Sequence, residues 1–383
     1  MSDYKLMKQV LDVIAQHGGF DSDDGLMRRL TREQGTGAIG ARFQDLLGGF
    51  NRTQQGSAVP ANTDMQGLTF FSRPNLNLSY NNIMAYRQLT ALAGQDPRSY
   101  SRIIRRMLWP DSYSADQIED NVIFNNKQAF MPLLSNTLTN MSGWPDLTLH
   151  AYSSTEGMAK ESWMMNDTIA EINGRFTLDC TFENALGDPV SLLFFAWILY
   201  IGGVYLGTKI QAAGYSIVQC EMDYNTRIYR FVTDWSGQYI QKWAACGAAF
   251  PSGLSLGSAF NYSRETPYNE SQKSIQSTFE CTIAEYNDPI TLWEFNKLTV
   301  MFNKDMGDGV RQQRMVKMSA EQRKLLNYRG YPWINLTGNN ELEWWIERAE
   351  YDMLVKGNFN GVVPTMVAAT DDADSNSLVS QTV

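Results

Sequence analysis

The chain has 383 residues, of which 43% are apolar, 12% aromatic and 19% charged. This length and composition exclude a mainly disordered chain and allow a large hydrophobic core. The net charge of −9 argues against a broad phosphate-binding surface, because nucleic-acid affinity depends on many Lys and Arg side chains. We therefore expect a folded protein without specific nucleic-acid recognition.

Residues 1–65 predict an N-terminal helical arm and linker. Apolar side chains recur at helical spacing in residues 4–16, and residues 35–65 are rich in Gly, Gln, Asn and Thr. The first residues lack the apolar segment of a signal peptide, so nothing here indicates secretion. Gly35–Gly40 fits the pattern G-x-G-x-x-G, but the preceding residues 28–34 cannot form a buried strand, so we predict no dinucleotide site.

Residues 66–172 predict a mixed region of strand and helix. Aromatic and β-branched residues become frequent here, which indicates that the folded body begins in this region. The pattern predicts an extended segment over residues 68–78, followed by helices over residues 83–93, 101–109 and 115–125.

Residues 173–310 predict a β-rich region that also contains two helices. Alternating apolar and polar residues indicate strands over residues 175–183 and 225–232. The sequence Asp-Trp-Ser-Gly at residues 234–237 predicts a hairpin turn into a further strand over residues 238–245. Strands joined in this way favour twisted antiparallel sheets.

One stretch in this region is a candidate for a membrane span. Residues 189–208 are 20 consecutive residues without a charge, which is long enough to cross a bilayer. Against a span stand the Gly202-Gly203 pair and the acidic residue Asp188 at the entry side. We predict a buried helix over residues 189–201, capped by Asp188, and no stable membrane insertion.

The Asp-Pro sequence that begins this stretch occurs twice. Residues 188–192 read Asp-Pro-Val-Ser-Leu and residues 288–292 read Asp-Pro-Ile-Thr-Leu, and a Cys-Thr pair precedes each copy. Asp is a favourable N-cap residue and Pro fits the first helical position, so each copy predicts a strand followed by a capped helix. The repetition indicates two related strand–helix subdomains or a chance match.

The C-terminal part divides into residues 311–369, predicted to be a helical region, and residues 370–383, predicted to be a disordered acidic tail. Amphipathic spacing predicts helices over residues 319–326 and 341–354. The last residues carry Asp and Ser without aromatic side chains, which is typical of a mobile terminus.

Side chains suited to metal or covalent chemistry are scarce. The chain has four cysteines and two histidines: Cys180, Cys220, Cys246, Cys281, His17 and His150. No Cys-x-x-Cys spacing prepares a zinc site, and two histidines leave little material for a Ser-His-Asp relay. We expect reduced, buried cysteines and no cofactor, with a two-disulfide secreted protein as the alternative.

Acidic clusters are the remaining candidates for catalysis or cation binding. They are Glu221/Asp223, Asp305/Asp308 and Asp21/Asp23/Asp24. Paired carboxylates could hold Mg²⁺ or act as acid and base, but none of these groups has a matching third ligand. The Asp21 loop also has Arg32 where an EF-hand requires an acid. We predict no catalytic residue, no cofactor-binding residue and no metal ligand, and therefore no enzyme.

Basic clusters are similarly small. They are Arg102/Arg105/Arg106 and Arg311/Arg314/Lys317. In an acidic protein, carboxylates of partner proteins are more favourable targets for three such charges than nucleic acid is. Ten Trp, 18 Tyr and 18 Met favour extensive packing, in a core or at protein interfaces.

Several segments resemble virion structural proteins of contractile-tailed bacteriophages. They are Thr69-Phe-Phe-Ser-Arg-Pro-Asn-Leu-Asn-Leu78, Phe130–Ser135 followed by Ser142–Asp146, and Asp223–Arg230. The resemblance covers roughly residues 66–310 and includes no catalytic signature. A looser similarity in length and in the repeated unit is to tail hub proteins, which contain two related β-rich subdomains.

Together these features predict an α+β fold: a twisted antiparallel β-rich body with two strand–helix subdomains, an N-terminal helical arm and a flexible C-terminal tail. The resemblance implies a non-enzymatic virion protein, assembled in the host cytoplasm with other virion proteins. It would form a homo-oligomeric ring in the tail or baseplate, as a hub or tube-adjacent component. The alternatives are a neck or connector protein, a tail-associated cell-wall hydrolase and, from the uncharged stretch, a membrane-associated protein.

Overall fold

The computed structural model describes residues 50, 62, 64–110, 124–167, 174–207, 222–337 and 340–356, except residues 95 and 97. Several predictions lie outside these described residues. They are the helix over 4–16, the linker up to residue 61, nearly all of the helix over 115–125, and the tail over 370–383. The Gly35–Gly40 motif, the Asp21 cluster, His17, Cys220 and Glu221 lie outside them as well.

The chain forms two compact units, which we describe separately. The first, here called the sheet unit, comprises residues 68–231 and 242–288. The second, here called the C-terminal unit, has residues 232–241 and 289–356 as its main described parts.

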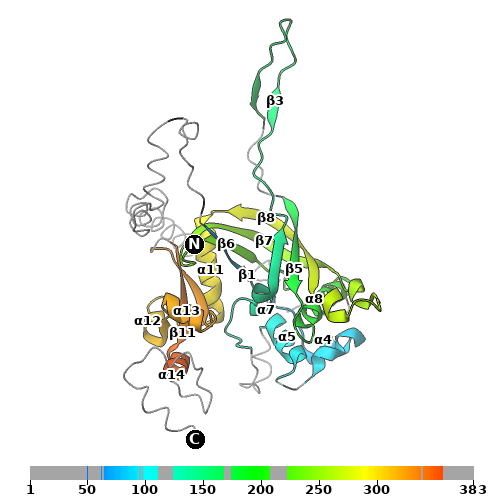
Figure 1. The fold of residues 1–383 in the computed structure, drawn as a ribbon, viewed down its shortest axis with the longest axis vertical. Coiled ribbons are helices and arrows are strands. Elements are labelled where there is room, and N and C mark those ends of the chain that lie inside the picture. Colours follow the sequence, from blue (N-terminus) through cyan, green and yellow to red (C-terminus); the bar gives the residue numbers. More distant parts are fainter. Residues whose placement is uncertain are drawn as a thin grey trace. The chain divides into compact units, whose positions relative to one another are not determined.

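A six-stranded antiparallel sheet forms the centre of the sheet unit and curls into a half-barrel (Figure 1). In spatial order its strands are β1 (Met65–Phe71), β6 (Ile228–Thr233), β7 (Ile240–Leu254), β8 (Ser274–Tyr286), β5 (Arg175–Glu183) and β2 (Leu138–Ser142). A separate two-stranded hairpin consists of β3 (Ala151–Ser153) and β4 (Met164–Asn166). The predicted α+β class with antiparallel sheets is confirmed.

Helices of the sheet unit lie between these strands in the sequence. They are α4 (Tyr80–Met84), η2 (Arg87–Ala93), α5 (Tyr100–Leu108), α7 (Pro132–Thr137), α8 (Pro189–Tyr205), η3 (Gly257–Phe260) and α10 (Tyr268–Ser271). The predicted helix over residues 101–109 is confirmed by α5, whereas the one over residues 83–93 is divided. The division falls at Tyr86, whose backbone is extended, between α4 and η2.

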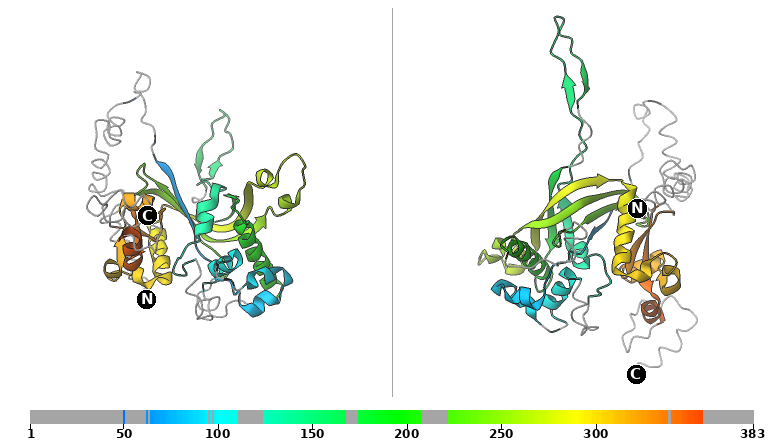
Figure 2. Two further views of the ribbon diagram at one scale, coloured as in Figure 1. Left: turned by 60° about the horizontal axis from the view of Figure 1, so that its bottom comes forward. Right: turned by 180° about the vertical axis from the view of Figure 1, so that it is seen from behind.

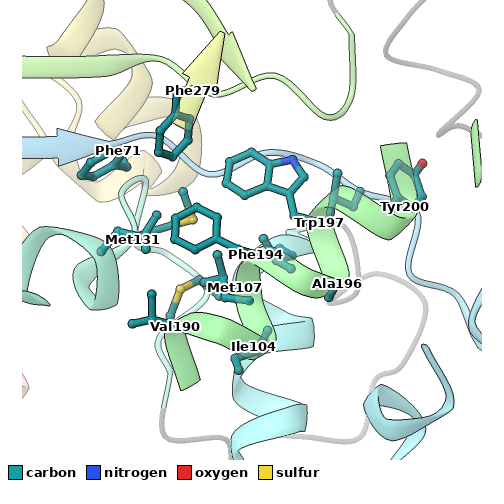
Figure 3. Close-up of a cluster of buried hydrophobic side chains, with 14 of the residues drawn as sticks. Phe71, Ile104, Met107, Met131, Val190, Phe194, Ala196, Trp197, Tyr200 and Phe279 are labelled. Carbon is teal, nitrogen blue, oxygen red and sulfur yellow. The ribbon is translucent and has the colours of Figure 1, made fainter. Parts of the chain in front are cut away.

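The core of the sheet unit is built by alternation in the sheet and by helix α8. On β5, Leu178, Cys180 and Phe182 are buried, while the residues between them point away from the core. Helix α8 packs Phe194 and Trp197 against Phe279 of β8, with ring centroids 5.7 Å and 6.3 Å from the Phe279 ring (Figure 3). Burying large aromatic side chains in this way contributes strongly to stability.

The strand and turn predictions in this region are confirmed. Residues 175–183 form β5, and β6 occupies the second half of the predicted strand over residues 225–232. The turn at residues 234–237 connects β6 and β7. Asp234 organises it, because its Oδ1 atom accepts hydrogen bonds from the backbone N–H groups of Gln238 (3.0 Å) and Tyr239 (3.1 Å).

Helix α8 confirms the predicted buried helix but not its predicted cap. Asp188 has a left-handed backbone (φ 50°) and makes no capping hydrogen bond with its side chain. Its Oδ1 atom instead accepts a hydrogen bond from Asn184 Nδ2 at 2.6 Å. An N-cap side chain reaches the first helical turn from extended backbone, and Asp188 does not have that conformation. Among the described helices, none combines the length and the apolar character that a membrane span requires.

Both copies of the Asp-Pro unit adopt the predicted order of strand and helix. Strand β5 leads into α8, and β8 leads into α11 (Pro289–Phe302). A residue in the left-handed region turns the chain at each junction: Asp188 in the first copy and Asn287 (φ 52°) in the second. The two strands also pair with each other, in antiparallel register, so that Cys180 lies opposite Ser277.

The C-terminal unit contains a three-stranded sheet with short helices. Its remaining elements are η4 (Lys304–Met306), α12 (Arg311–Arg314), β9 (Met315–Lys317), α13 (Ala320–Leu325), β10 (Tyr331–Asn335), β11 (Glu341–Glu347) and α14 (Arg348–Lys356). The strand order is β10-β11-β9. The helix predicted over residues 319–326 is confirmed by α13, and Ser319 begins it with a capping box.

The helix predicted over residues 341–354 is wrong in its first half, which forms strand β11. Leu342, Trp345 and Ile346 fit helical spacing, but Leu342, Trp344 and Ile346 fit the two-residue period of a strand equally well. Strands β10 and β9 pair with β11 on its two sides, and these partners decide between the two periods. Only the second half, α14, is helical.

A buried polar cluster fixes helix α8 to two other segments of the sheet unit. The Tyr200 hydroxyl donates a hydrogen bond to the buried carboxylate of Asp223 and accepts one from the Asn77 backbone N–H at 3.2 Å. One turn earlier, Trp197 Nε1 donates to the carbonyl of Tyr224 at 2.9 Å. Burial, with a smaller contribution from Asp223, raises the pKa of Tyr200 above its ordinary value.

Replacing Tyr200 by Phe should lower the free energy of unfolding by about 1–3 kcal/mol at pH 8, because it removes a donor to a buried carboxylate. The raised pKa means that the unfolded chain releases the Tyr200 proton first as the pH rises above about 10. The wild type therefore loses this contribution at high pH, and Y200F has none to lose. Urea unfolding at pH 8 and at pH 10.5 should show the difference shrinking; a constant difference would contradict the assignment.

Candidate assembly surfaces

The first exposed feature is the β3–β4 hairpin with its two connecting segments, here called the hairpin arm (residues 143–167). Strands β3 and β4 pair in antiparallel register, with Tyr152 opposite Met165. Figures 1 and 2 show the hairpin arm extending away from the six-stranded sheet, beyond the end of β2. The Tyr152 and Trp163 rings contact each other across the arm, with centroids 6.1 Å apart.

The root of the hairpin arm is tightly packed against the sheet. Gly143 has a φ of +111°, and a Cβ atom there would lie 2.1 Å from the Thr177 carbonyl oxygen, so only glycine fits. Next to it, the Trp144 ring packs between Phe176 and Tyr286, with centroid distances of 5.7 Å and 6.2 Å. This packing defines where the arm leaves the sheet.

Beyond its root, the hairpin arm exposes apolar side chains that nothing in the described chain covers. They are Leu147, Leu149, Tyr152, Met158, Trp163, Met164 and Met165, each at least half exposed. A two-stranded hairpin has no core of its own and is marginally stable in water. A concentration of apolar side chains on such an element marks a protein-interaction surface. Met side chains suit it, because they adapt to irregular partners.

A second exposed apolar surface lies where β5 ends and β8 begins. It consists of Leu186 (90% exposed), Phe260 (80%), Tyr262 (90%), Tyr100 and Tyr268, and is here called the end patch. Direct contacts connect its segments. The Tyr100 ring lies against the backbone of Gly187, and the Tyr268 hydroxyl is 3.5 Å from Asp188 Oδ2.

The face of the sheet opposite the α8 core is polar. On β5 it presents Thr177, Asp179 and Glu183, and on β8 it presents Gln276, Thr278, Glu280 and Thr282. Thr278 Oγ1 donates to Asp179 Oδ1 at 2.9 Å, so neighbouring strands are connected across this face. On these two strands the face carries three acidic side chains, Asp179, Glu183 and Glu280, and one basic side chain, Arg175.

The acidic pairs considered for chemistry have structural partners where they are described. Asp223 accepts the Tyr200 hydrogen bond, Asp305 pairs with Arg314 at 2.7 Å, and Asp308 lies 3.4 Å from Arg311. Within the described ranges, no group of three His, Cys, Asp or Glu side chains could hold a metal ion. The absence of catalytic and cofactor residues stays a prediction.

The six residues of the two basic clusters were expected to contact partner proteins. Four of them contact their own chain through interactions described below: Arg105, Arg311, Arg314 and Lys317. Arg105 is buried, donates from Nε to the Leu78 carbonyl at 2.9 Å and lies over the Trp109 ring. Lys317 lies 2.8 Å from Glu343 and 3.2 Å from Glu341. For these residues the fold itself provides groups that satisfy the charges, and contacts to partner proteins stay a prediction.

Arg311 contacts two aromatic rings in addition to Asp308. Its guanidinium lies 3.7 Å from the centroid of the Trp333 ring and 5.3 Å from that of Trp345. It also donates to the Met306 carbonyl at 3.0 Å. Trp345 in turn donates from Nε1 to Glu343 at 2.9 Å, which fixes the ring that the guanidinium contacts. The cluster is a structural centre of the C-terminal unit.

Three of the four cysteines are described, and they are buried without a disulfide, as expected. Cys180 and Cys281 lie on the core-facing sides of β5 and β8, and Cys246 lies on β7. Burial raises the pKa of the Cys180 thiol to about 12. A thiol with such a pKa stays protonated and is a poor nucleophile.

Sequence reasoning missed both apolar surfaces. The signal for the hairpin arm was the alternation around Leu147 and Leu149, together with the apolar run at Trp163–Met165. The end patch had a weaker signal, because its residues come from three separate segments. Neither set of residues could be distinguished from core residues without knowing which strands pair.

A sequence-family comparison now identifies the class of protein. The model of the family described as "Putative phage tail tube protein" matches residues 14–360, which is most of the chain. The chain belongs to this family. Tail tube proteins are structural, non-enzymatic components of the virion and assemble with other tail proteins into oligomeric rings. The resemblance to phage tail proteins and the expectation of a non-enzymatic role are therefore confirmed.

Solved structures give more distant matches to this tail tube protein. One is the tube-terminating cap of the anti-feeding prophage: TM-score 0.25, 13% identity, covering 45% of this chain and 97% of that one. Another is the sheath-tube complex of the extracellular contractile injection system PVC in its extended state: TM-score 0.25, 12% identity, 42% and 82% coverage. A third is the PVC sheath/tube terminator in its extended state: TM-score 0.22, 10% identity, covering 39% of this chain and 85% of that one. No match to a curated protein sequence was found.

Replacing Arg311 by Lys should destabilise the C-terminal unit of this tail tube protein by about 1–2 kcal/mol, because an ammonium group cannot stack on two indole rings as a planar guanidinium does. The matched control is Arg314→Lys, whose side chain is 69% exposed and makes one ion pair. That change should cost less than about 0.5 kcal/mol. Urea unfolding of both variants measures the effect, and equal losses would show that stacking does not matter.

Proposed function

We propose that the chain forms a homo-oligomeric ring that is a repeating part of the tail tube in a contractile-tailed phage. The observation that carries the proposal is the hairpin arm, whose exposed apolar side chains have no covering surface within the described chain. In a ring or a stack of rings, a neighbouring copy covers them. The phage family supports the tube, and the segments that resemble proteins of contractile-tailed phages support the contractile class.

We further propose that the polar face of β5 and β8 lines the channel. The other face of these strands is covered by the α8 core, so the polar face is the side of the sheet that is available to solvent. Its acidic side chains, among them Asp179 and Glu280, would repel the phosphate backbone. DNA would then pass along the channel without binding to it.

The proposed partners are the sheath and other tail proteins, and the proposed site of assembly is the host cytoplasm. One of the solved structures to which the chain is similar is a sheath-tube complex, which motivates the first of these. We propose that residues 1–65 and residues 370–383 contribute contacts to adjacent subunits. In this arrangement residues 66–172, 173–310 and 311–369 form the body of each subunit.

A triple change of the hairpin arm, Trp163→Ser with Met164→Ser and Met165→Ser, should stop assembly without unfolding the chain. These side chains are exposed, so their removal should change the free energy of unfolding by less than about 1 kcal/mol. Analytical ultracentrifugation and negative-stain electron microscopy should show rings or tubes for the wild type and smaller species for the variant.

The matched control for that experiment is Met301→Ser with Met353→Ser in the C-terminal unit, where the two side chains are 49% and 46% exposed. This control should assemble as the wild type does. Rings or tubes formed normally by the triple variant would contradict the role of the arm. A wild type that stays monomeric at high concentration would contradict the ring itself.

The channel assignment makes a separate prediction for Glu280→Lys. A ring repeats the change in every subunit, so the channel wall gains two units of positive charge per copy and should retain added DNA at low salt. Tubes of Glu321→Lys, a change on the exposed residue Glu321 of α13, serve as the control. We expect several-fold more DNA to co-sediment with E280K tubes than with control tubes; equal amounts would place β8 away from the channel.

A further inference from the structure

Strand β10 lies at one edge of the three-stranded sheet in the C-terminal unit, and helix α11 packs along it. One side of β10 pairs with β11 in antiparallel register, from Tyr331 opposite Trp345 to Asn335 opposite Glu341. The backbone groups on the other side are those that a strand of another molecule could bind. What α11 does with these groups decides whether the edge is open.

The side-chain amide of Asn296 on α11 takes the place of a neighbouring strand. Its Nδ2 atom donates to the Ile334 carbonyl oxygen at 2.7 Å, and its Oδ1 atom accepts from the Ile334 backbone N–H at 2.8 Å. A residue of a paired antiparallel strand would make the same two hydrogen bonds. Asn296 is 4% exposed and lies inside the helix, where Asn is unfavourable, so the two bonds offset a cost in helix stability.

The next outward-facing residue of β10 is closed as well. Because Ile334 directs its backbone groups to α11, the alternation of an antiparallel pair makes Pro332 the other outward residue. Pro332 has no N–H, and its carbonyl oxygen lies 3.4 Å from the Thr299 hydroxyl, which is also 3.2 Å from the Phe295 carbonyl. Asn296 and Thr299 are three residues apart and so share one face of α11.

The opposite edge of the sheet, β9, is protected differently. It has three residues, Met315–Lys317. The Lys317 ammonium at its end lies 2.8 Å from Glu343 and 3.2 Å from Glu341. Short edge strands and lysines on them both disfavour pairing with another chain. Both edges of this sheet are therefore shielded, one by side chains of a helix and the other by length and charge.

We propose that Asn296 and Thr299 act as a strand mimic that keeps the C-terminal sheets of two copies of this chain from pairing through β10. The excluded partner is a second copy, because two β10 strands could pair antiparallel about a two-fold axis. Subunits of an oligomer meet at high local concentration, where an open edge is a site of aggregation. Such pairing would compete with any assembly of the chain, whatever the geometry of the ring.

Replacing Asn296 by Leu should open the edge, because Leu is of similar size and has no hydrogen-bonding group. In hydrogen exchange with mass spectrometry, peptides covering residues 331–336 should exchange roughly tenfold faster or more than in the wild type. N296L should also form thioflavin-positive species in proportion to its concentration, and the wild type should not. An N296L chain that matches the wild type in both measurements overturns the proposal. Should N296L fail to fold, Asn296→Ser carries the same test, because its short side chain cannot bind both backbone groups.

Two matched variants separate an open edge from a general loss of stability. Met306→Ala leaves a cavity in the core of the C-terminal unit, where Met306 is fully buried, and keeps Asn296 in place. It should lower the Tm at least as much as N296L does but bind no thioflavin below that Tm. Thr299→Val removes the weaker contact, to a residue without N–H, and should change exchange less than N296L. If M306A associates as strongly as N296L, loss of stability is the cause and the strand mimic is overturned.

Photo-crosslinking locates the contact that forms when the edge is open. Benzoylphenylalanine is placed at the exposed position 337, just beyond β10, in a mixture of isotope-labelled and unlabelled copies. N296L should give crosslinks between copies to residues 330–337, and chains with Asn296 intact should give none there. Crosslinks of N296L to other parts of a second copy would overturn the proposal. Failure of the wild type to form rings would overturn the proposed function and would leave these outcomes unchanged.

Discussion

The packing of helix α8 against β5 and β8 is the interaction on which the rest of the sheet unit depends. Phe194 and Trp197 fill the inner face of the sheet at Phe279, and Tyr200 binds Asp223 one turn further along the helix. Helix α8 and the helices that belong to the same buried cluster cover this face, whereas the opposite face is polar. Strand β5, which contributes Leu178, Cys180 and Phe182 to this core, runs from the root of the hairpin arm to the end patch.

Where the sequence carried a strong local signal, the fold could be predicted from it. The alternation in β5, the uncharged run that became α8 and the Ser319 capping box each determine their element through residues close together in the chain. Strand β11 could not be predicted in this way. Its residues fit both the helical and the strand period, and the choice was made by β9 and β10, whose paired residues lie up to 32 positions away in sequence but are adjacent in space.

The functional surfaces were less predictable than the fold, for a related reason. Exposed apolar side chains such as Met164 and Leu186 have the same sequence signature as core residues. The charged residues that sequence reasoning singled out are instead used inside the fold, as Arg311 is between Trp333 and Trp345. The Asp-Pro unit shows that a correct prediction of elements does not fix the conformation of a single residue. A strand and a helix follow each other as expected, but the left-handed backbone of Asp188 prevents the expected cap.

An apolar arm on a subunit that must stay dispersed before assembly is a liability, and the structure limits it in two ways. The net charge of −9, with a net charge of −3 on the arm itself, opposes contact between arms of different copies. At the root, Gly143 and Trp144 restrict the directions in which the arm can leave the sheet. An arm restricted in this way would lose less conformational entropy on binding than a flexible loop, so more of the apolar burial would remain as binding free energy. In the proposed ring, repulsion between arms and restriction at the root would together favour contact of the arm with a different surface of a neighbouring copy over aggregation of arms with one another.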